Sequence, residues 1–414
     1  MTSLIYKTVL SLLLLYSFIF SQQGWVQQSV LTSSYLYCVS FVSTNTGWAC
    51  GQNGTLLKTT NGGTNWTPQI SGVTGFLYTI FFIDANTGWA AGQNGALRKT
   101  TNGGTNWFGQ SSTFNQYIYS NFFTDAFTGY FCGSGGTIYK TTDGGTSWVQ
   151  KTSNVSVTLS CLHFPVSAVY MTGYISGGSG TEGVVLKTSS GGENWTQLAG
   201  TGTNWLFGVY FSDNLTGWAG GINGAMLHTT NGGANWISQT SGTANRIVQL
   251  AFANNNTGWA VGYTGTIIYT TNGGSNWTTQ LTPTIQNLWG VDFVDVNTGW
   301  AVGWNGTVLH TTNGGVTGVK QISVEIPSDF KLFQNYPNPF NPNTIIRYQI
   351  AEAVNVKLIL YNILGTEAAT LADGLHSPGT YETELNAENL SSGIYFYKLF
   401  AGNFTEAKKI IIIK

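Results

Sequence analysis

The chain has 414 residues, and its formal net charge at neutral pH is −1. This balance excludes the strongly basic surface on which binding to nucleic acid or to an anionic membrane depends. Charged residues make up only 8 % of the chain, whereas Gly, Thr, Asn, Ser and aromatic residues are abundant. Such a composition favours short β-strands joined by tight turns and disfavours helices. We therefore expect an all-β protein.

The N-terminus has the features of an export signal. Lys7 precedes an apolar run from Val9 to Phe20, and small and polar residues follow. The run is too short for a transmembrane helix, and no later segment is long enough. We predict a signal peptide over residues 1–21, export by the Sec pathway, and no transmembrane segment.

Export permits disulfide bonds among Cys38, Cys50, Cys132 and Cys161. The spacing favours a Cys38–Cys50 bond within one hairpin, and buried free thiols are an equally weighted alternative. No CxxC motif and no histidine cluster accompanies these cysteines. We therefore expect no metal site.

Two motifs recur along the first three quarters of the chain. The string "TTNGGTNW" ends at Trp66 and again at Trp107, and a seventh copy at 311–316 ("TTNGGV") stops before its Trp. Most successive copies are 41 residues apart. The second motif, "NTGWA", places Trp48, Trp89, Trp218, Trp259 and Trp300.

The fourth copy departs from this period. Tyr130 takes the third Trp position of the second motif, and Tyr170 is assigned to the fourth. The first-motif residues Trp148 and Trp195 are 47 rather than 41 residues apart. We assign the extra residues to an insertion within 173–183.

Each copy predicts four short strands, which in copy two are 77–83, 88–92, 96–100 and 106–110. The turns between them are rich in Gly, Asn and Asp, as in tight hairpins. Seven such copies predict a seven-bladed β-propeller over residues 22–318. The segment "GWVQQS" at 24–29 matches the fourth-strand pattern, so Trp25 would supply the missing seventh Trp and close the ring.

The string "TTDGGTSW" at 141–148 resembles the Asp-box, or BNR repeat. With the "NTGWAVG" motif, the repeat is similar to that of the photosystem II stability/assembly factors. The resemblance implies the propeller fold. Physically, we expect the box to be a turn: its Asn or Asp accepts backbone N–H groups, its glycines adopt positive φ, and its Trp covers the result. A phosphate-binding loop would instead contain Lys and precede a helix.

Enzymes also contain the Asp-box, but their catalytic groups are not evident. Resemblance to sialidases implies an arginine cluster, which Arg98 and Arg246, the two arginines of the propeller segment, cannot form. Glycosidases need a pair of carboxylates, and within the propeller segment only Glu182 and Asp292 lie outside repeated turn positions. We predict no catalytic residue and no cofactor. A glycan-directed hydrolase using Glu182 or Asp292 remains the alternative, and a structural surface or adhesion component is a third.

We expect ligand binding on the face that carries the loops into the first strand and between strands two and three. These positions vary from copy to copy, and many are aromatic. Aromatic side chains at loop tips suit an extracellular glycan or protein ligand. The candidate binding residues are Tyr35, Phe76, Tyr117, Glu182, Trp205, Arg246, Tyr263 and Trp304.

Residues 319–414 contain no copy of either motif, and their alternating pattern predicts a small Ig-like β-sandwich. From Phe330 to Lys414 the segment resembles the type A C-terminal sorting domain of the type IX secretion system. The resemblance implies the type IX machinery at the outer membrane as a partner and a secreted or cell-surface location. The resemblance rests on Asn335, Tyr336, Pro337, Asn338, Pro339, Phe340, Gly365, Gly393, Tyr395, Lys408 and Lys409.

Overall fold

The computed structural model describes residues 24–414, except 111–113, 166–170, 181, 199–201, 203, 316–318 and 388–389. The predicted signal peptide lies outside the described residues. Two compact units follow, Gly24–Gly315 and Val316–Lys414. None of the helices in the described part is long and apolar enough to span a bilayer.

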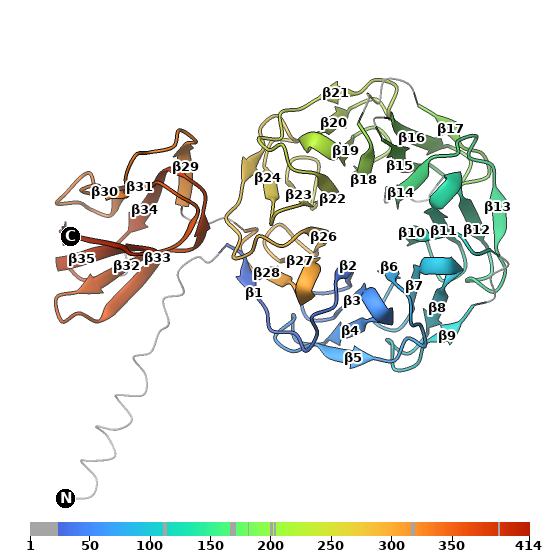
Figure 1. The fold of residues 1–414 in the computed structure, drawn as a ribbon, viewed down its shortest axis with the longest axis horizontal. Helices are drawn as coiled ribbons and strands as arrows, with labels where there is room; N and C mark the ends of the chain where they lie inside the picture. Colours follow the sequence, from blue (N-terminus) through green and yellow to red (C-terminus); the bar gives the residue numbers. More distant parts are fainter. Residues whose placement is uncertain are drawn as a thin grey trace, which may run out of the picture. The chain divides into compact units, whose positions relative to one another are not determined.

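In the first unit, the described strands form seven four-stranded antiparallel sheets arranged in a ring (Figure 1). We number the sheets one to seven in chain order. Their first strands lie nearest the ring centre and are β2 (Leu36–Phe41), β6 (Leu77–Phe82), β10 (Ile118–Phe123), β14 (Thr158–His163), β18 (Leu206–Phe211), β22 (Ile247–Phe252) and β26 (Leu288–Phe293).

The second strands begin at the Gly of the "NTGWA" motif and are almost entirely buried. They are β3 (Gly47–Gly51), β7 (Gly88–Gly92), β11 (Gly129–Gly133), β15 (Gly173–Ser179), β19 (Gly217–Gly221), β23 (Gly258–Gly262) and β27 (Gly299–Gly303). The third strands end at the first Thr of each box. They are β4 (Leu56–Thr59), β8 (Leu97–Thr100), β12 (Ile138–Thr141), β16 (Glu182–Thr188), β20 (Met226–Thr229), β24 (Ile267–Thr270) and β28 (Val308–Thr311).

Short 3-10 turns join the second strand to the third in five sheets. They are η1 (Gln52–Gly54), η2 (Gln93–Gly95), η3 (Ser134–Gly136), η4 (Ile222–Gly224) and η5 (Trp304–Gly306). The fourth strands are short and lie at the outer edge. They are β5 (Thr67–Gln69), β9 (Phe108–Gly109), β13 (Val149–Lys151), β17 (Thr196–Gln197), β21 (Ile237–Ser238) and β25 (Thr278–Thr279).

Sheet seven takes its fourth strand from the other end of the chain. β1 (Val26–Gln27) pairs antiparallel with β28, with Val26 opposite His310. The predicted pairing of the N-terminal strand with the last sheet is therefore present. Trp25 is 5 % exposed, and its Nε1 donates to Oε1 of Gln280 at 2.8 Å.

An aromatic stack joins each pair of neighbouring sheets. Trp48 lies parallel to Phe82 of the next sheet, with ring centroids 3.5 Å apart, and its Nε1 donates to the carbonyl of Gly103. Burial of these large rings is a main source of stability between sheets. The equivalent stacks are Trp89–Phe123, Tyr130–Phe164, Tyr174–Phe211, Trp218–Phe252, Trp259–Phe293 and Trp300–Phe41.

The fourth copy differs from the sequence prediction. Tyr174 occupies the fourth Trp position, because its ring stacks on Phe211 and its hydroxyl donates to the Asn214 carbonyl. Tyr170, which we assigned to that position, lies outside the described residues. The extra residues also fall in two places instead of one. Phe164 and Gly173 are nine positions apart, whereas the equivalent Phe123 and Gly129 are six apart. The remaining extra residues lengthen the β15–β16 hairpin.

The second unit contains two four-stranded sheets in its described residues, with the orders β29-β34-β31-β30 and β33-β32-β35-β36. Buried side chains from both sheets, among them Tyr348 and Tyr397, form its core. The strands are β29 (Val319–Ser323), β30 (Lys331–Leu332), β31 (Asn343–Ile350), β32 (Val354–Asn362), β33 (Glu367–His376), β34 (Gly379–Asn386), β35 (Gly393–Ala401) and β36 (Phe404–Ile412).

Candidate functional site

The box motif forms the turn between the third and fourth strands. In copy two, Oγ1 of Thr100 accepts hydrogen bonds from the N–H groups of Asn102 and Gly104. Oδ1 of Asn102 accepts from the N–H of Asn106 at 2.9 Å. These bonds satisfy backbone donors that a tight turn leaves without strand partners. The box therefore uses its polar atoms to hold its own turn.

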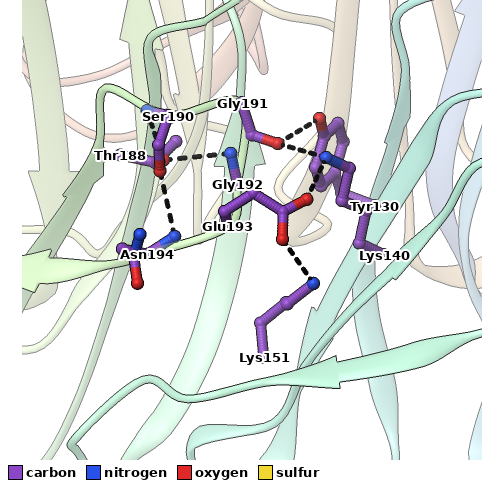
Figure 2. Close-up of polar contacts among 9 residues, drawn as sticks. All are labelled: Tyr130, Lys140, Lys151, Thr188, Ser190, Gly191, Gly192, Glu193 and Asn194. Carbon is purple, nitrogen blue, oxygen red and sulfur yellow. Dashed lines mark hydrogen bonds and ion pairs between the residues drawn. The ribbon is translucent and has the colours of Figure 1, made fainter.

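The box of copy four also contacts the preceding sheet (Figure 2). The carbonyl of Gly191 accepts from the hydroxyl of Tyr130 and from Nζ of Lys140, both at 2.8 Å. Glu193 pairs with Lys140 at 2.6 Å and with Lys151 at 2.7 Å. Hydrogen bonds from these two lysines lower the pKa of Glu193 to about 2. This carboxylate joins two sheets and has the protonation state of an ion-pair partner, not of a general acid.

The carboxylates considered for catalysis lie at opposite ends of their strands. Glu182 begins β16 at the tip of the long hairpin, opposite Ser179, and is exposed. Asp292 lies opposite Trp300 near the other end of its sheet, and Oδ2 accepts the N–H of Phe41 at 2.6 Å. Burial raises the pKa of Asp292 to about 7. The structure does not bring the two residues together as a catalytic pair.

All four cysteines are free thiols. Cys38 and Cys50 lie opposite each other in β2 and β3, but Sγ of Cys38 donates to the Ile80 carbonyl and Sγ of Cys50 to the Leu77 carbonyl. The favoured Cys38–Cys50 disulfide is therefore wrong, and the free-thiol alternative holds. No group of three or more metal-ligating side chains occurs among the described residues.

A cavity of about 330 Å³ opens at the centre of the ring of sheets. Its walls are the inner faces of the first strands, and they carry aromatic side chains interspersed with small and polar ones. We call it the central cavity. Its aromatic lining residues are Tyr37, Tyr78, Tyr119, Trp205, Phe207 and Trp289.

Two of the predicted binding residues, Trp205 and Arg246, line the central cavity. Three others form its rim. Tyr35 stacks on Trp304 with centroids 4.8 Å apart, and Tyr263 contacts Trp304 at 6.3 Å. The structure therefore groups residues from sheets one, five, six and seven at one end of the ring.

Of the other predicted residues, Phe76 and Tyr117 lie next to the lining residue Tyr78, whereas Glu182 lies in a different part of the ring. Phe76 contacts Tyr78 with centroids 5.9 Å apart, and Tyr117 lies 6.3 Å from the same ring. Neither Phe76 nor Tyr117 lines the central cavity. Glu182 is at the hairpin tip of sheet four and does not line it either.

Sequence reasoning missed the main wall of the central cavity. It consists of the residues that lie two positions after the loop residue that enters each first strand, such as Tyr35 or Trp205. They are Tyr37, Tyr78, Tyr119, Phe207 and Trp289. These positions also vary from copy to copy, and that variability could have identified them. The equivalent residues of sheets four and six are Ser160 and Val248. A β-bulge in each first strand turns this position toward the ring centre.

Deeper along the ring centre, side chains three residues further along four of the first strands contact one another from sheet to sheet. Phe81 contacts Phe122 at 4.8 Å, Phe122 contacts His163 at 5.6 Å, and His163 contacts Tyr210 at 4.4 Å, all between ring centroids. Burial lowers the pKa of His163 to about 3, so its imidazole is neutral. These four side chains do not themselves line the central cavity, but they narrow the ring centre beyond it.

The predicted sorting residues form a different structure in the second unit. Asn335 is 2 % exposed and its Nδ2 donates to the Pro337 carbonyl and to Oγ1 of Thr344. Phe340 is buried and pairs with Ile411 of β36 through its backbone N–H. Tyr336 is 82 % exposed.

The other sorting residues lie at turns or along the last two strands. Gly365 forms the β32–β33 turn with φ of +76°, and the hydroxyl of Tyr395 donates to the Ser391 carbonyl. Lys408 pairs with Glu406. The backbone carbonyl of Lys409 accepts from Asn338. Pro339 and Gly393 complete the set, Gly393 at the start of β35.

Comparison with known proteins identifies both units. The family "Photosynthesis system II assembly factor YCF48" matches residues 19–112, 110–202 and 199–283, and "Secretion system C-terminal sorting domain" matches residues 334–413. No curated protein matches the chain significantly.

Solved structures show the same fold. A YCF48 bound to a D1 peptide is 20 % identical with a TM-score of 0.60, covering 70 % of this chain and 97 % of that one. YCF48 from Cyanidioschyzon merolae is also 20 % identical, with a TM-score of 0.58 and coverages of 70 % and 98 %. The WD40 propeller domain of Doa1 is 12 % identical, with a TM-score of 0.58 and coverages of 70 % and 96 %. Because the matched segments span well over half of the sequence, the chain belongs to the YCF48 photosystem II assembly factor family, and it ends in a secretion-system sorting domain.

Proposed function

We propose that this chain is a secreted or cell-surface binding protein that does not catalyse a reaction. Its seven sheets are the blades of a seven-bladed propeller, and its second unit is an Ig-like sorting domain read by the type IX machinery. The observation that carries the proposal is the central cavity. Aromatic walls with a few polar groups are typical of ligand sites.

Two further observations support binding over catalysis. A related YCF48 is bound to a D1 peptide, so a propeller of this family can hold a ligand. In this chain, Asp292 is used at a sheet junction and Glu182 lies at a hairpin tip, so no carboxylate pair faces the central cavity among the described residues. The ligand is an extracellular glycan or protein.

A glycan and protein array with the mature chain tests this function. Trp205 lines the central cavity and Trp304 lies at its rim, so Trp205→Ala and Trp304→Ala should each weaken binding at least tenfold. Phe108→Ala is the matched control, because Phe108 is 58 % exposed on the outer strand β9. Binding that survives both tryptophan changes would remove the central cavity as the site.

The hydrolase alternative has its own test. Glu182→Gln combined with Asp292→Asn is assayed against a polysaccharide panel beside the unmodified chain. Turnover that the double variant abolishes while retaining its fold would support an enzyme. Turnover in neither protein, or equal turnover in both, leaves these two residues without a catalytic role.

Export through the sorting domain is tested by deleting residues 319–414. The full-length protein should reach the cell surface or the medium, and the truncated protein should remain inside the cell envelope. Cell fractionation with an antibody to the propeller measures the difference. Equal surface display of both proteins would contradict the role of the second unit.

A further inference from the structure

Among the described residues that line the central cavity, Arg246 is the only positively charged one. The guanidinium carbon of Arg246 lies 4.6 Å from the ring centroids of both Phe207 and Tyr263. Its Nη1 donates to the hydroxyl of Tyr263 at 2.9 Å. No carboxylate among the described residues pairs with it. Two aromatic rings fix this guanidinium, and its remaining N–H groups can bind an anionic group.

Other groups in the central cavity are also donors. Nε1 of Trp289 is buried and has no hydrogen-bond partner within the described residues. A buried indole N–H normally finds a partner, so this donor fits a ligand acceptor. Tyr37, Tyr78 and Tyr119 line the same walls, and burial raises the pKa of each phenol. These phenols therefore keep their protons and can donate.

The shape of the central cavity limits what can enter. The side chains of Phe81, Phe122, His163 and Tyr210 narrow the ring centre beyond the central cavity, so an end group is favoured over the middle of a polymer. The wall is interrupted at sheet four. There Thr158 and Ser160 line the central cavity with hydroxyl groups instead of rings. The long β15–β16 hairpin belongs to the same sheet.

Aromatic faces, several hydroxyls and one unpaired guanidinium match the surface of an acidic sugar. Such a ring has an apolar C–H face, hydroxyl acceptors and a carboxylate. A plain apolar ligand would leave Arg246 and Trp289 unpaired in a closed site, at the cost of burying polar groups without partners. A peptide end group satisfies the charge but makes less use of the hydroxyl-bearing walls.

We propose that the central cavity binds the terminal uronic-acid residue of an acidic glycan, with Arg246 pairing its carboxylate and the aromatic walls holding its ring. This inference rests on the proposed binding function and narrows its ligand class. Arg246 selects for the negative charge of the ligand, and Trp205 and Trp289 provide the affinity for its sugar ring.

The test compares a matched pair of probes: tri-galacturonate and its fully methyl-esterified form, which has the same skeleton without charge. Calorimetric titration of the mature chain should give binding of the acid at least tenfold tighter than of the ester. Arg246→Gln should remove this preference, whereas Arg246→Lys should retain most of it. Arg98→Gln is the control, because Arg98 bonds the carbonyls of Ser71 and Gly72 away from the central cavity. Thermal unfolding verifies that each variant is folded.

The outcomes separate this inference from the proposed function. Equal binding of acid and ester, no binding of either, or an unchanged preference in folded Arg246→Gln would overturn the acidic-glycan assignment. If the array still finds a ligand that Trp205→Ala abolishes, the binding function stands without it. A peptide ending in glutamate serves as a third probe, and its binding in the absence of uronate binding would replace the glycan by a protein end group.

Discussion

Asp292 of sheet seven accepts a hydrogen bond from the backbone N–H of Phe41 in sheet one, at 2.6 Å. This bond crosses the junction at which the first and last sheets of the ring meet. The same junction holds the Trp300–Phe41 stack, with ring centroids 3.4 Å apart. Side-chain acceptors join other neighbouring first strands as well, for example Ser40 to the N–H of Phe82 and Gln249 to the N–H of Val291. Asp292 is the only carboxylate within the first strands that the structure describes.

Replacing Asp292 should change how the free energy of unfolding depends on pH. Its folded pKa of about 7 is raised above the value of the unfolded chain, so the folded state binds the proton more tightly. Its contribution is therefore full below about pH 4 and is lost as the pH rises toward 7. Asp292→Asn keeps an oxygen acceptor without charge, and it should gain about 4 kcal/mol at pH 8 relative to the unmodified chain, as a pKa raised from about 4 to about 7 implies.

Denaturant unfolding of both proteins from pH 4 to pH 8 measures this effect. His163 contributes the opposite slope at acidic pH in both proteins, because burial lowers its pKa. The difference between the two proteins isolates Asp292 and should vanish near pH 4. A constant difference across the whole range would contradict a buried titrating carboxylate.

Loss of the N-terminal strand should open the ring at sheet seven. Trp25 is 5 % exposed, bonds Gln280 and packs edge-on against Phe293 at 5.7 Å. Trp25→Ala should cost about 3–5 kcal/mol of unfolding free energy. Deletion of residues 24–29 should in addition expose the edge of β28 and promote self-association. Denaturant unfolding and size-exclusion chromatography read the two effects, and a monomeric deletion variant of unchanged stability would argue against closure by β1.

The Asp-box should act as a structural turn. Oγ1 of Thr100 is buried and accepts two backbone N–H groups, so Thr100→Val leaves these donors unpaired. We expect a loss of about 1–2 kcal/mol. The matched control is Thr101→Val at the adjacent, exposed position of the same box, with an expected change within about 0.5 kcal/mol. Equal losses at both positions would contradict the assignment of the turn to Thr100.

The cysteines should remain unreactive thiols in the native protein. Burial raises the pKa of Cys38 to about 11 and that of Cys50, Cys132 and Cys161 above the usual range. A thiol reagent at pH 8 should therefore label none of them until denaturant is added, and should then label all four. Labelling of only two after denaturation of the exported protein would reveal a disulfide bond.

The repeat period made most of the fold predictable. The predicted strands of copy two, 77–83, 88–92, 96–100 and 106–110, correspond to Leu77–Phe82, Gly88–Gly92, Leu97–Thr100 and Phe108–Gly109. The pairing of β1 with β28 was predictable for the same reason, because Trp25 completes a pattern that copy seven leaves unfinished. Where the period is disturbed, as at Tyr174, spacing alone assigned the wrong residue.

The candidate site was less accessible to sequence reasoning. Tyr35, Arg246 and Trp304 were identified as variable residues on one face, but the deeper wall of Tyr37 and Trp289 was not. A strict two-residue alternation along a strand does not indicate which position faces the ring centre when a bulge intervenes. That orientation depends on how each first strand packs against its two neighbours.

By itself, the sequence determined the all-β class, the repeated sheets, the turn role of the box and the sorting domain, because each depends on local motifs at fixed spacing. Only the tertiary structure decided that Asp292 holds a junction, that the cysteines are unpaired, and that Arg246 lies among aromatic rings with no carboxylate partner in the described part of the chain. The Asp292–Phe41 and Arg246–Phe207 contacts join residues of different copies, 251 and 39 positions apart. These contacts form only when the ring of sheets closes, so the spacing of local motifs does not predict them.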